Sequence, residues 1–547
     1  MLNNRHAITT QHRRWIEFFF GEQLVEAHST KQYEDAVAWA LESTGEVLAA
    51  GEDGFEIDLP DRGAADAIYK SLTVPTLTIH GDQDICQHVD RGRAFAEITG
   101  GELVVIEGAG HLTPAREPVE VNRAIRDFVE RTKGISMPSH VWARGMSRRK
   151  RALYLSSPIG LGHARRDLAI VEELRKIEPD LEIDWLAQHP VTVALEAAGE
   201  TVHPASEWLA SESGHIASEA SGHELHCFQA LRRMDEILVA NFMVFQEVVE
   251  EGLYDLVIGD EAWDIDYYWH ENPELKRGTN VWMTDFVGYL PMPEGGDHEA
   301  YLTADYNAEM IEHIARFPRV RDRAIFVGNP DDIVPEVFGP DLPKIRDWTE
   351  EHFDFSGYIT GFTPPTEGQV EEWRAELGYE PDEKVCIVTV GGSGVGRDLL
   401  EKVIAAYPLA KEKIPELRMV AVAGPRIEPE SLSGHPGLEV LGYVDRLYQH
   451  LSVCDLAVVQ GGLTTTMELT AAQRPFLYFP LLNHFEQNFH VRHRLDQYGA
   501  GRHMDYRSTD PDHLAEAIAT EVGRQVHYGP VETDGAQRAA RMISELI

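Results

Sequence analysis

Short apolar runs alternate with longer amphipathic stretches over most of this chain. Apolar runs predict strands that are buried on both faces, and apolar residues three or four positions apart predict helices. Between residues 151 and 350 the predicted strands are Ala152–Ser156, Leu181–Leu186, Leu256–Ile258, Val281–Thr284 and Ala324–Val327. The predicted helices are His163–Lys176, Val191–Ala198, Met234–Glu251 and Ala304–Arg316. This alternation predicts a parallel, doubly wound sheet.

The same alternation returns between residues 383 and 527, after a connector over 351–382 that is rich in Gly, Pro and charge. The predicted strands are Val385–Val390, Arg418–Val422, Leu438–Leu441, Leu456–Val459 and Phe476–Phe479. The predicted helices are Asp398–Lys413, Leu447–Val453, Thr464–Ala472, Phe485–Tyr498 and Pro511–Val522. A last helix, Gly535–Leu546, lies in a C-terminal segment, 528–547. The pattern predicts two α/β domains that face each other across a cleft.

Residues 1–134 form a different block. Trp15–Leu48 is helical in character, Val74–Asp84 and Glu102–His111 each begin as a buried strand, and Pro118–Arg131 predicts a helix. Residues 135–150 carry Gly, Pro, Ser and a short basic run, which predicts a linker.

Composition narrows the class of protein. The 547 residues suit about three domains, and the net charge of −42 argues against nucleic acid as a partner. No apolar run is long enough to span a membrane and the N-terminus lacks the apolar core of a signal peptide, so we expect a cytoplasmic protein with at most peripheral membrane contact. The four cysteines are scattered. We expect Cys386 and Cys454 to be core residues rather than metal ligands.

Candidate chemistry gathers at glycine-rich turns that follow predicted strands. Gly160, Gly162 and His163 follow the first strand of the 151–350 domain, and Gly391, Gly392, Ser393, Gly394 and Arg397 follow the first strand of the 383–527 domain. Gly461 and Gly462 then precede Thr464, Thr465 and Glu468 at the start of a helix. Backbone N–H groups at such a helix start bind phosphate, and a carboxylate one turn later suits ribose hydroxyls. Ligands of doubly wound sheets bind at these loops.

Together these motifs resemble the GT-B glycosyltransferases, and glycosyltransferase family 28 in particular. The resemblance rests on Gly162-His163, on the pattern G-G-x-x-T-x-x-E that ends at Glu468, and on the later proline strand and Gln487-Asn488. It implies two facing Rossmann-like domains and transfer of a hexose from a UDP-sugar to a hydroxyl of a lipid or small molecule.

The resemblance also implies roles for single residues. Glu468 would hold the ribose, while Ser393, Gly394 and the Gly461–Thr465 turn would hold the diphosphate, with Arg397 as a further candidate. Gln487 and Asn488 would meet the sugar. His163 would be the general base or would orient the acceptor, and Asp260 and Asp285, at strand ends, would assist. Helix dipoles rather than a metal would help the diphosphate to leave, so no metal or cofactor is expected.

Other classes of function stay open. A nucleotide-sugar epimerase and a binding module without activity are alternatives, whereas a nicotinamide-dependent oxidoreductase is disfavoured because Arg165 replaces the third glycine of G-x-G-x-x-G. The segment His223–Cys227 is one residue short of H-E-x-x-H, and Asp264–Asp266 is expected on the surface, so neither predicts a metal site.

The N-terminal block resembles the C-terminal part of an α/β-hydrolase. The match is H-G-D-Q-D around Asp84 and G-A-G-H around His111, which would be the triad acid and base. No G-x-S-x-G nucleophile motif occurs in the chain. We therefore expect either a degenerate fragment or a bifunctional hydrolase–glycosyltransferase whose true start lies upstream.

Overall fold

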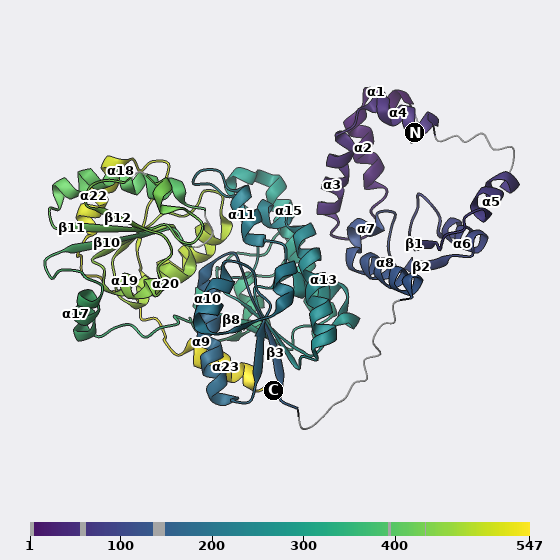
Figure 1. Cartoon of the computed structure of the whole chain (residues 1–547). Helices are drawn as coiled ribbons and strands as arrows, with labels where there is room; N and C mark the ends of the chain where they lie inside the picture. The colour runs from purple at the N-terminus through teal and green to yellow at the C-terminus, as the bar shows by residue number, and fades with distance from the viewer. Residues whose placement is uncertain (1–4, 55–61, 135–147, 392–394, 433) are drawn as a thin grey trace. The chain divides into compact units, whose positions relative to one another are not determined.

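The computed structural model describes residues 5–54, 62–134, 148–391, 395–432 and 434–547. The chain divides into two compact units, Met1–Met146 and Ser147–Ile547 (Figure 1). Among the described residues, the strands form three sheets, and every strand pair within them is parallel. The α/β class predicted from the alternation of apolar runs is confirmed.

The first unit combines a small sheet with helices. Strand β1 (Leu77–Gly81) pairs with β2 (Glu102–Ile106), so that His80 lies opposite Val105. The helices are α1 (Arg5–Thr10), α2 (His12–Gly21), α3 (Thr30–Leu41), α4 (Gly45–Gly54), α5 (Arg62–Lys70), α6 (Val89–Thr99), α7 (Thr113–Arg116) and α8 (Pro118–Lys133). The two predicted strands and the predicted closing helix are present. The hydrolase relationship itself stays a prediction.

The second unit begins with a seven-stranded sheet in the order β5-β4-β3-β6-β7-β8-β9. Its strands are β3 (Arg151–Ser156), β4 (Glu182–Trp185), β5 (Thr201–Val202), β6 (Leu256–Asp260), β7 (Thr279–Thr284), β8 (Arg323–Phe326) and β9 (Asp354–Phe355). Its helices are α9 (Leu161–Ile177), α10 (Val191–Ala198), α11 (Glu212–Glu219), α12 (Cys227–Arg232), α13 (Asp235–Gly252), α14 (Trp263–Glu271), α15 (Gly296–Arg316) and α16 (Ile345–His352).

A six-stranded sheet follows in the order β12-β11-β10-β13-β14-β15. Its strands are β10 (Lys384–Thr389), β11 (Leu417–Val422), β12 (Leu438–Leu441), β13 (Leu456–Val459), β14 (Phe476–Tyr478) and β15 (Arg502–His503). Its helices are α17 (Glu367–Glu376), α18 (Arg397–Lys413), α19 (Leu447–Val453), α20 (Leu463–Ala471), α21 (Arg492–Tyr498) and α22 (Pro511–Glu521). In both large sheets the first strand is central and the chain winds outward to either side, which creates a switch point next to β3 and next to β10.

Apolar residues on both sides of the central strands explain why these sheets form. Val385 and Ile387 of β10 point into the core that contains Met467 of α20, whereas Cys386 and Val388 point into the core with α18 and α22. Figure 1 shows α18 and α22 on one face of this sheet and α19 and α20 on the other. The expected core positions of Cys386 and Cys454 are confirmed, since both are fully buried.

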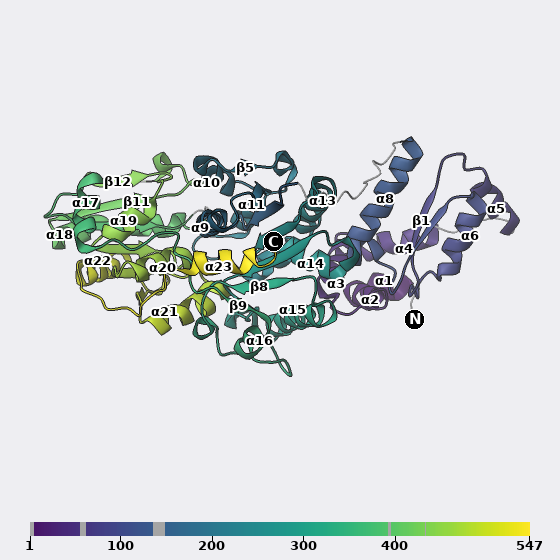
Figure 2. The same ribbon diagram turned by 90° about the horizontal axis from the view of Figure 1, so that it is seen from below.

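The C-terminal helix α23 (Gly535–Ser544) returns to the first large sheet. It packs against α9, and Ala539, Ala540 and Ile543 are completely buried there. Figures 1 and 2 both place the yellow α23 beside elements of that sheet rather than with the six-stranded sheet that precedes it. The last helix therefore links the two halves of the second unit.

Two expectations about local structure are wrong. The Asp264–Asp266 segment is not on the surface: it lies in α14, where both aspartates are buried and Asp266 pairs with Arg321 at 2.6 Å. The predicted helix Phe485–Tyr498 is not a continuous α-helix, because Glu486–Val491 forms a π-helix before α21 begins. π-Helical turns recur at functional sites.

The His223–Cys227 segment joins the two halves of the second unit. Leu225 donates its N–H to the carbonyl of Leu482 at 3.0 Å, and the ring of His223 lies 3.2 Å from the carbonyl oxygen of Pro480. The segment contributes to a contact between domains. Among the described residues, we find no helix that is both long and apolar enough to cross a membrane.

Candidate active site

A cavity of about 210 Å³ lies where the carboxyl ends of the two large sheets meet. Its wall includes residues that follow β3 and β7 in one sheet and residues at the ends of β10, β11 and β13 in the other. Both switch points therefore open into the same space. Ligands of doubly wound sheets bind at such points.

Two helix starts meet at this cavity. Helix α9 begins at Leu161 after Gly160, and α20 begins at Leu463 after Gly462. A methyl group added at Gly162 would lie 2.1 Å from Oγ1 of Thr464, so the two starts touch and only glycine fits. Two sets of unpaired N–H groups converge here, which favours an anion.

Most of the residues predicted for phosphate binding line this cavity. They are Gly160, Gly162, Gly391, Gly462, Thr464 and Thr465. Gly461 lies just behind them with φ = +112°, which favours glycine, and packs against the backbone of Pro480. Gly392, Ser393 and Gly394 lie outside the described residues.

Glu468 lies at the cavity wall on α20 and is only 2% exposed. Its Oε1 accepts a hydrogen bond of 2.8 Å from Nη1 of Arg165, which comes from α9 in the other domain. Burial raises the pKa of Glu468, and the Arg165 charge acts in the opposite direction. The residue predicted to hold ribose thus has a partner from the facing domain.

His163 lies in a cluster of buried charges. Its Nδ1 is 3.1 Å from Oδ2 of Asp260, at the end of β6. Arg166, one turn further along α9, donates to both oxygens of Asp260 and to Asp285. Glu261 follows Asp260, and its Oε2 lies 3.7 Å from Nε2 of His163. His163 and Asp285 both line the cavity.

Burial and the neighbouring charges raise the pKa of three groups in and beside this cluster. Burial and Arg166 lower the pKa of His163, but Asp260 and Glu261 outweigh them and raise it to about 9. Burial and the neighbouring Asp285 raise the pKa of Glu261 to about 7. Burial, Asp285 and Glu261 raise the pKa of Glu486, which also lines the cavity, to about 8. Groups that titrate near neutral pH are suited to proton transfer.

Three predicted site residues make contacts of other kinds. Gln487 lines the cavity, and its side-chain oxygen accepts the N–H of Leu481 at 2.8 Å. Asn488 donates to the carbonyls of Leu481 and His484 and is not among the cavity residues. Arg397 donates to Oγ of Ser431 at 2.7 Å and likewise lies outside the cavity wall.

Three groups of side chains among the described residues are close enough to share a metal ion. They are His163 with Glu261 and Asp285, Glu271 with Glu309 and His313, and Asp84 with Cys86 and His111. In the first group the Arg166 guanidinium already holds Asp285.

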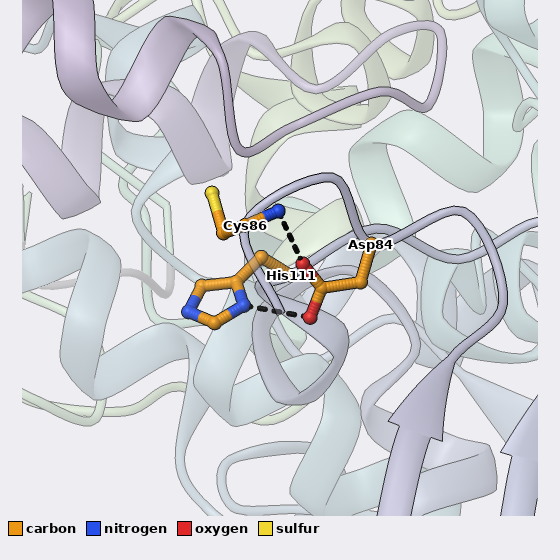
Figure 3. Close-up of side chains that lie close together, drawn as sticks. All are labelled: Asp84, Cys86 and His111. Carbon is orange, nitrogen blue, oxygen red and sulfur yellow. Dashed lines mark hydrogen bonds and ion pairs between the residues drawn. The ribbon is translucent and has the colours of Figure 1, made fainter. Parts of the chain in front are cut away.

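The Asp84–His111 pair lies in the first unit. Nδ1 of His111 is 2.8 Å from Oδ2 of Asp84, and Oδ1 of Asp84 accepts the backbone N–H groups of Cys86 and Gln87 (Figure 3). Asp84 is buried, while the side chain of His111 is 34% exposed. The predicted acid and base therefore lie within hydrogen-bond distance of each other, while their role in a triad stays a prediction.

Several residues of the cavity and its charged cluster were not predicted. Arg165 pairs with Glu468, and Arg166 pairs with Asp260. Glu261 lies beside His163. Glu486 precedes the Gln-Asn pair that was singled out. Arg165 and Glu486 could have been singled out, because they lie within the G-L-G-H-A-R and E-Q-N motifs. Their partners could not, because the Arg165–Glu468 pair forms only where the two domains meet.

The C-terminal half of the second unit is similar to a known protein family. Residues 385–541 match the glycosyltransferase family 28 C-terminal domain. This match covers the six-stranded sheet, Glu468 and the Gln487 segment. The family predicted from the glycine and glutamate motifs is therefore supported for this domain, and the relatives below agree with a transferase enzyme.

Curated relatives match over part of their length. An uncharacterized glycosyltransferase of Methanopyrus kandleri is 30% identical over 172 residues, which are 31% of this chain and 48% of that protein. The UDP-N-acetylglucosamine–N-acetylmuramyl-(pentapeptide) pyrophosphoryl-undecaprenol N-acetylglucosamine transferase of Mycobacterium sp. (strain KMS) is 29% identical over 181 residues, 32% of this chain and 48% of that protein. The chain thus spans about half the length of these relatives.

Solved structures of glycosyltransferases are also similar to this chain. The glycotransferase of kitacinnamycin has a TM-score of 0.46 at 17% identity and covers 73% of this chain and 95% of its own. The spinosyn rhamnosyltransferase with its aglycone has a TM-score of 0.45 at 15% identity and covers 72% and 95%.

Proposed function

We propose that this protein is a glycosyltransferase that moves a hexose from a UDP-sugar to a hydroxyl of a lipid or small molecule. The observation that carries the proposal is the single cavity that joins His163 of one domain to Thr464, Thr465 and Glu468 of the family 28 domain. A donor held by the second domain would present its sugar to the first.

The donor would lie with its nucleotide on the family 28 domain. Glu468 would accept hydrogen bonds from the ribose hydroxyls, as a carboxylate that follows a glycine turn does in other nucleotide sites. The N–H groups at the starts of α20 and α9 would stabilise the diphosphate as its charge grows during departure. Gln487 would contact the sugar.

The transfer requires a proton acceptor for the attacking hydroxyl. The acceptor oxygen bonds to the anomeric carbon, the bond from that carbon to the diphosphate breaks, and the hydroxyl proton leaves. A His163 with a pKa of about 9 carries a proton at pH 7, so it would orient the acceptor and stabilise negative charge. The carboxylate of Asp285 faces the same cavity and would accept the proton.

A direct test measures UDP release. The purified protein is incubated with a panel of UDP-sugars, with and without acceptor extracts, and free UDP is quantified. We expect release that depends on both the donor and the acceptor. No release with any donor would overturn the proposal, and an epimerised UDP-sugar as product would replace it with the epimerase alternative.

The Asp84–His111 pair favours hydrolysis as a second function for the first unit. The geometry is the one expected for the acid and base of a triad, whereas a G-x-S-x-G nucleophile motif is absent from this sequence, so hydrolysis would need a nucleophile from another source. An in-frame upstream sequence that encodes this motif, with ester hydrolysis that His111→Gln abolishes, is the expected result. A stop codon directly upstream contradicts it.

A further inference from the structure

Arg165 is the feature of this cavity that the proposed function leaves unexplained. It occupies the first turn of α9, and its guanidinium crosses to the other domain to pair with Glu468 at 2.8 Å. Glu468 is almost completely buried, whereas the Arg165 side chain keeps 31% of its surface exposed. Arg165 therefore has room to move, and Glu468 does not.

Arg165 differs in charge from most of the ionisable side chains around the cavity. Among the described residues that line it, Arg165 is the only arginine or lysine, while Asp285, Glu468 and Glu486 contribute carboxyl groups. Arg166 is held by Asp260 and Asp285 and does not line the cavity. His163 with its raised pKa is the other cationic side chain of the wall, and a ligand with two phosphate groups would gain a second positive charge if Arg165 turned toward it.

The position of Arg165 on its helix brings it near the expected phosphate site. The start of α9 touches the start of α20 at Gly162 and Thr464, and Arg165 is three residues further along. Side chains in a helix lean toward its N-terminus, so Arg165 leans toward this meeting point. A guanidinium binds phosphate oxygens through two parallel hydrogen bonds.

We propose that Arg165 is a donor-binding residue that exchanges partners: it holds Glu468 in the free protein and the donor diphosphate in the complex. The inference rests on the proposed function, since it requires a nucleoside diphosphate in this cavity. Ribose hydroxyls take Glu468 as Arg165 leaves it. The ion pair joins the two domains at this cavity, and the contact with the diphosphate compensates Arg165 for its loss.

The exchange predicts opposite effects on two ligands. In Arg165→Met, Glu468 is released from its partner, so uridine, which has no phosphate, binds more tightly. UDP loses the guanidinium contact that Arg165 would provide and binds more weakly. We expect the ratio of the uridine Kd to the UDP Kd to fall at least tenfold, as measured by calorimetry on the full chain.

Matched variants separate this role from a structural one. Arg175→Met removes another paired arginine from the same helix, which binds Glu200 away from the cavity, and should leave the ratio unchanged. Arg165→Lys keeps the charge but not the two parallel hydrogen bonds and should give an intermediate ratio. If Arg165→Met is unstable, the ratio in Arg165→Lys provides the test.

The possible outcomes distinguish the two proposals. If the wild-type protein binds neither UDP nor uridine, the proposed function fails. If UDP binds but the ratio is the same in wild type, Arg165→Met and Arg165→Lys, Arg165 does not contact the diphosphate. If both ligands bind more tightly in Arg165→Met by the same factor, Arg165 is only a latch between domains and the exchange is refuted.

Discussion

Glu468 is the residue whose substitution most directly tests the donor site. Its carboxylate is buried, so its two oxygen atoms are acceptors in a fixed position. Glu468→Gln keeps the shape but removes the charge, and we expect UDP to bind about tenfold more weakly or worse, which is the usual effect of losing a hydrogen bond to a charged group. Calorimetry with UDP measures it. Glu516→Gln, an exposed position on α22, serves as the control, and unchanged affinity in Glu468→Gln would remove its assigned role.

The raised pKa of His163 predicts that the stability of the protein depends on pH. Its pKa is raised from 6.5 to about 9, so the folded state binds the proton more tightly than the unfolded state. This contribution, on the order of 3 kcal/mol, is complete below pH 6.5 and is lost as the pH rises through 9. The raised pKa values of Glu261 and Glu486 act in the same direction.

We therefore expect the free energy of unfolding to fall between pH 6.5 and pH 9.5. Urea titrations at several pH values measure this fall, which should be smaller in His163→Gln because Gln cannot take up a proton. His513→Gln replaces a histidine on the surface and should retain the wild-type slope. A stability that rises over this interval would show that the folded state does not retain the His163 proton.

At the scale of elements, the contact between the N-terminal ends of α9 and α20 is so close that one added methyl group should disturb it. Gly162→Ala would place a carbon 2.1 Å from Oγ1 of Thr464, so the helix starts must separate. We expect a cost of about 1–3 kcal/mol in unfolding free energy, as for other overpacked sites, and weaker UDP binding. Thr464→Gly removes the clashing atoms, so the double variant should recover part of the stability.

Gly160 provides the matched control for stability. A methyl group added there meets no atom within 4 Å, so Gly160→Ala should leave the unfolding free energy nearly unchanged. If Gly162→Ala is as stable as Gly160→Ala, the two helix starts are not in contact in solution.

Strands with long apolar runs were predictable, whereas short edge strands were not. The strand Leu456–Val459 is fully buried and was found at its predicted position as β13; Leu438–Leu441 was found as β12, although that edge strand is partly exposed. By contrast β5, β9 and β15 have two residues each, which is too short for any periodic pattern. Helix α14 was missed because its aspartates suggest a surface, and their burial depends on Arg321, 55 residues away from Asp266.

The same limit applies to the candidate site. Glycine turns and Glu468 belong to local motifs, so sequence reasoning located them beside the cavity. The pairing of Glu468 with Arg165 joins residues 303 positions apart, and the cluster of His163, Asp260 and Arg166 joins α9 to β6. Such contacts depend on how distant parts of the chain pack together, and local sequence patterns do not predict this packing.

At the scale of the whole molecule, the proposed donor site lies within one of the two compact units. Every residue that lines the cavity lies in Ser147–Ile547, as do both large sheets and helix α23, which closes back onto α9. The first unit has its own small core around Ile106, Ala109 and Val121. Domains with separate cores can fold separately.

Residues 148–547 produced alone should therefore bind UDP with the affinity of the full chain, within about twofold, and unfold at a similar urea concentration. The reason is that none of the described residues that line the cavity or form the two large cores lies in the first unit. Calorimetry and urea titration on both proteins make the comparison, and loss of the Arg165-dependent ratio would be a sensitive sign of a disturbed site. A folded fragment that no longer binds UDP would mean that the first unit contributes to the donor site, and would contradict the division of labour between the two units.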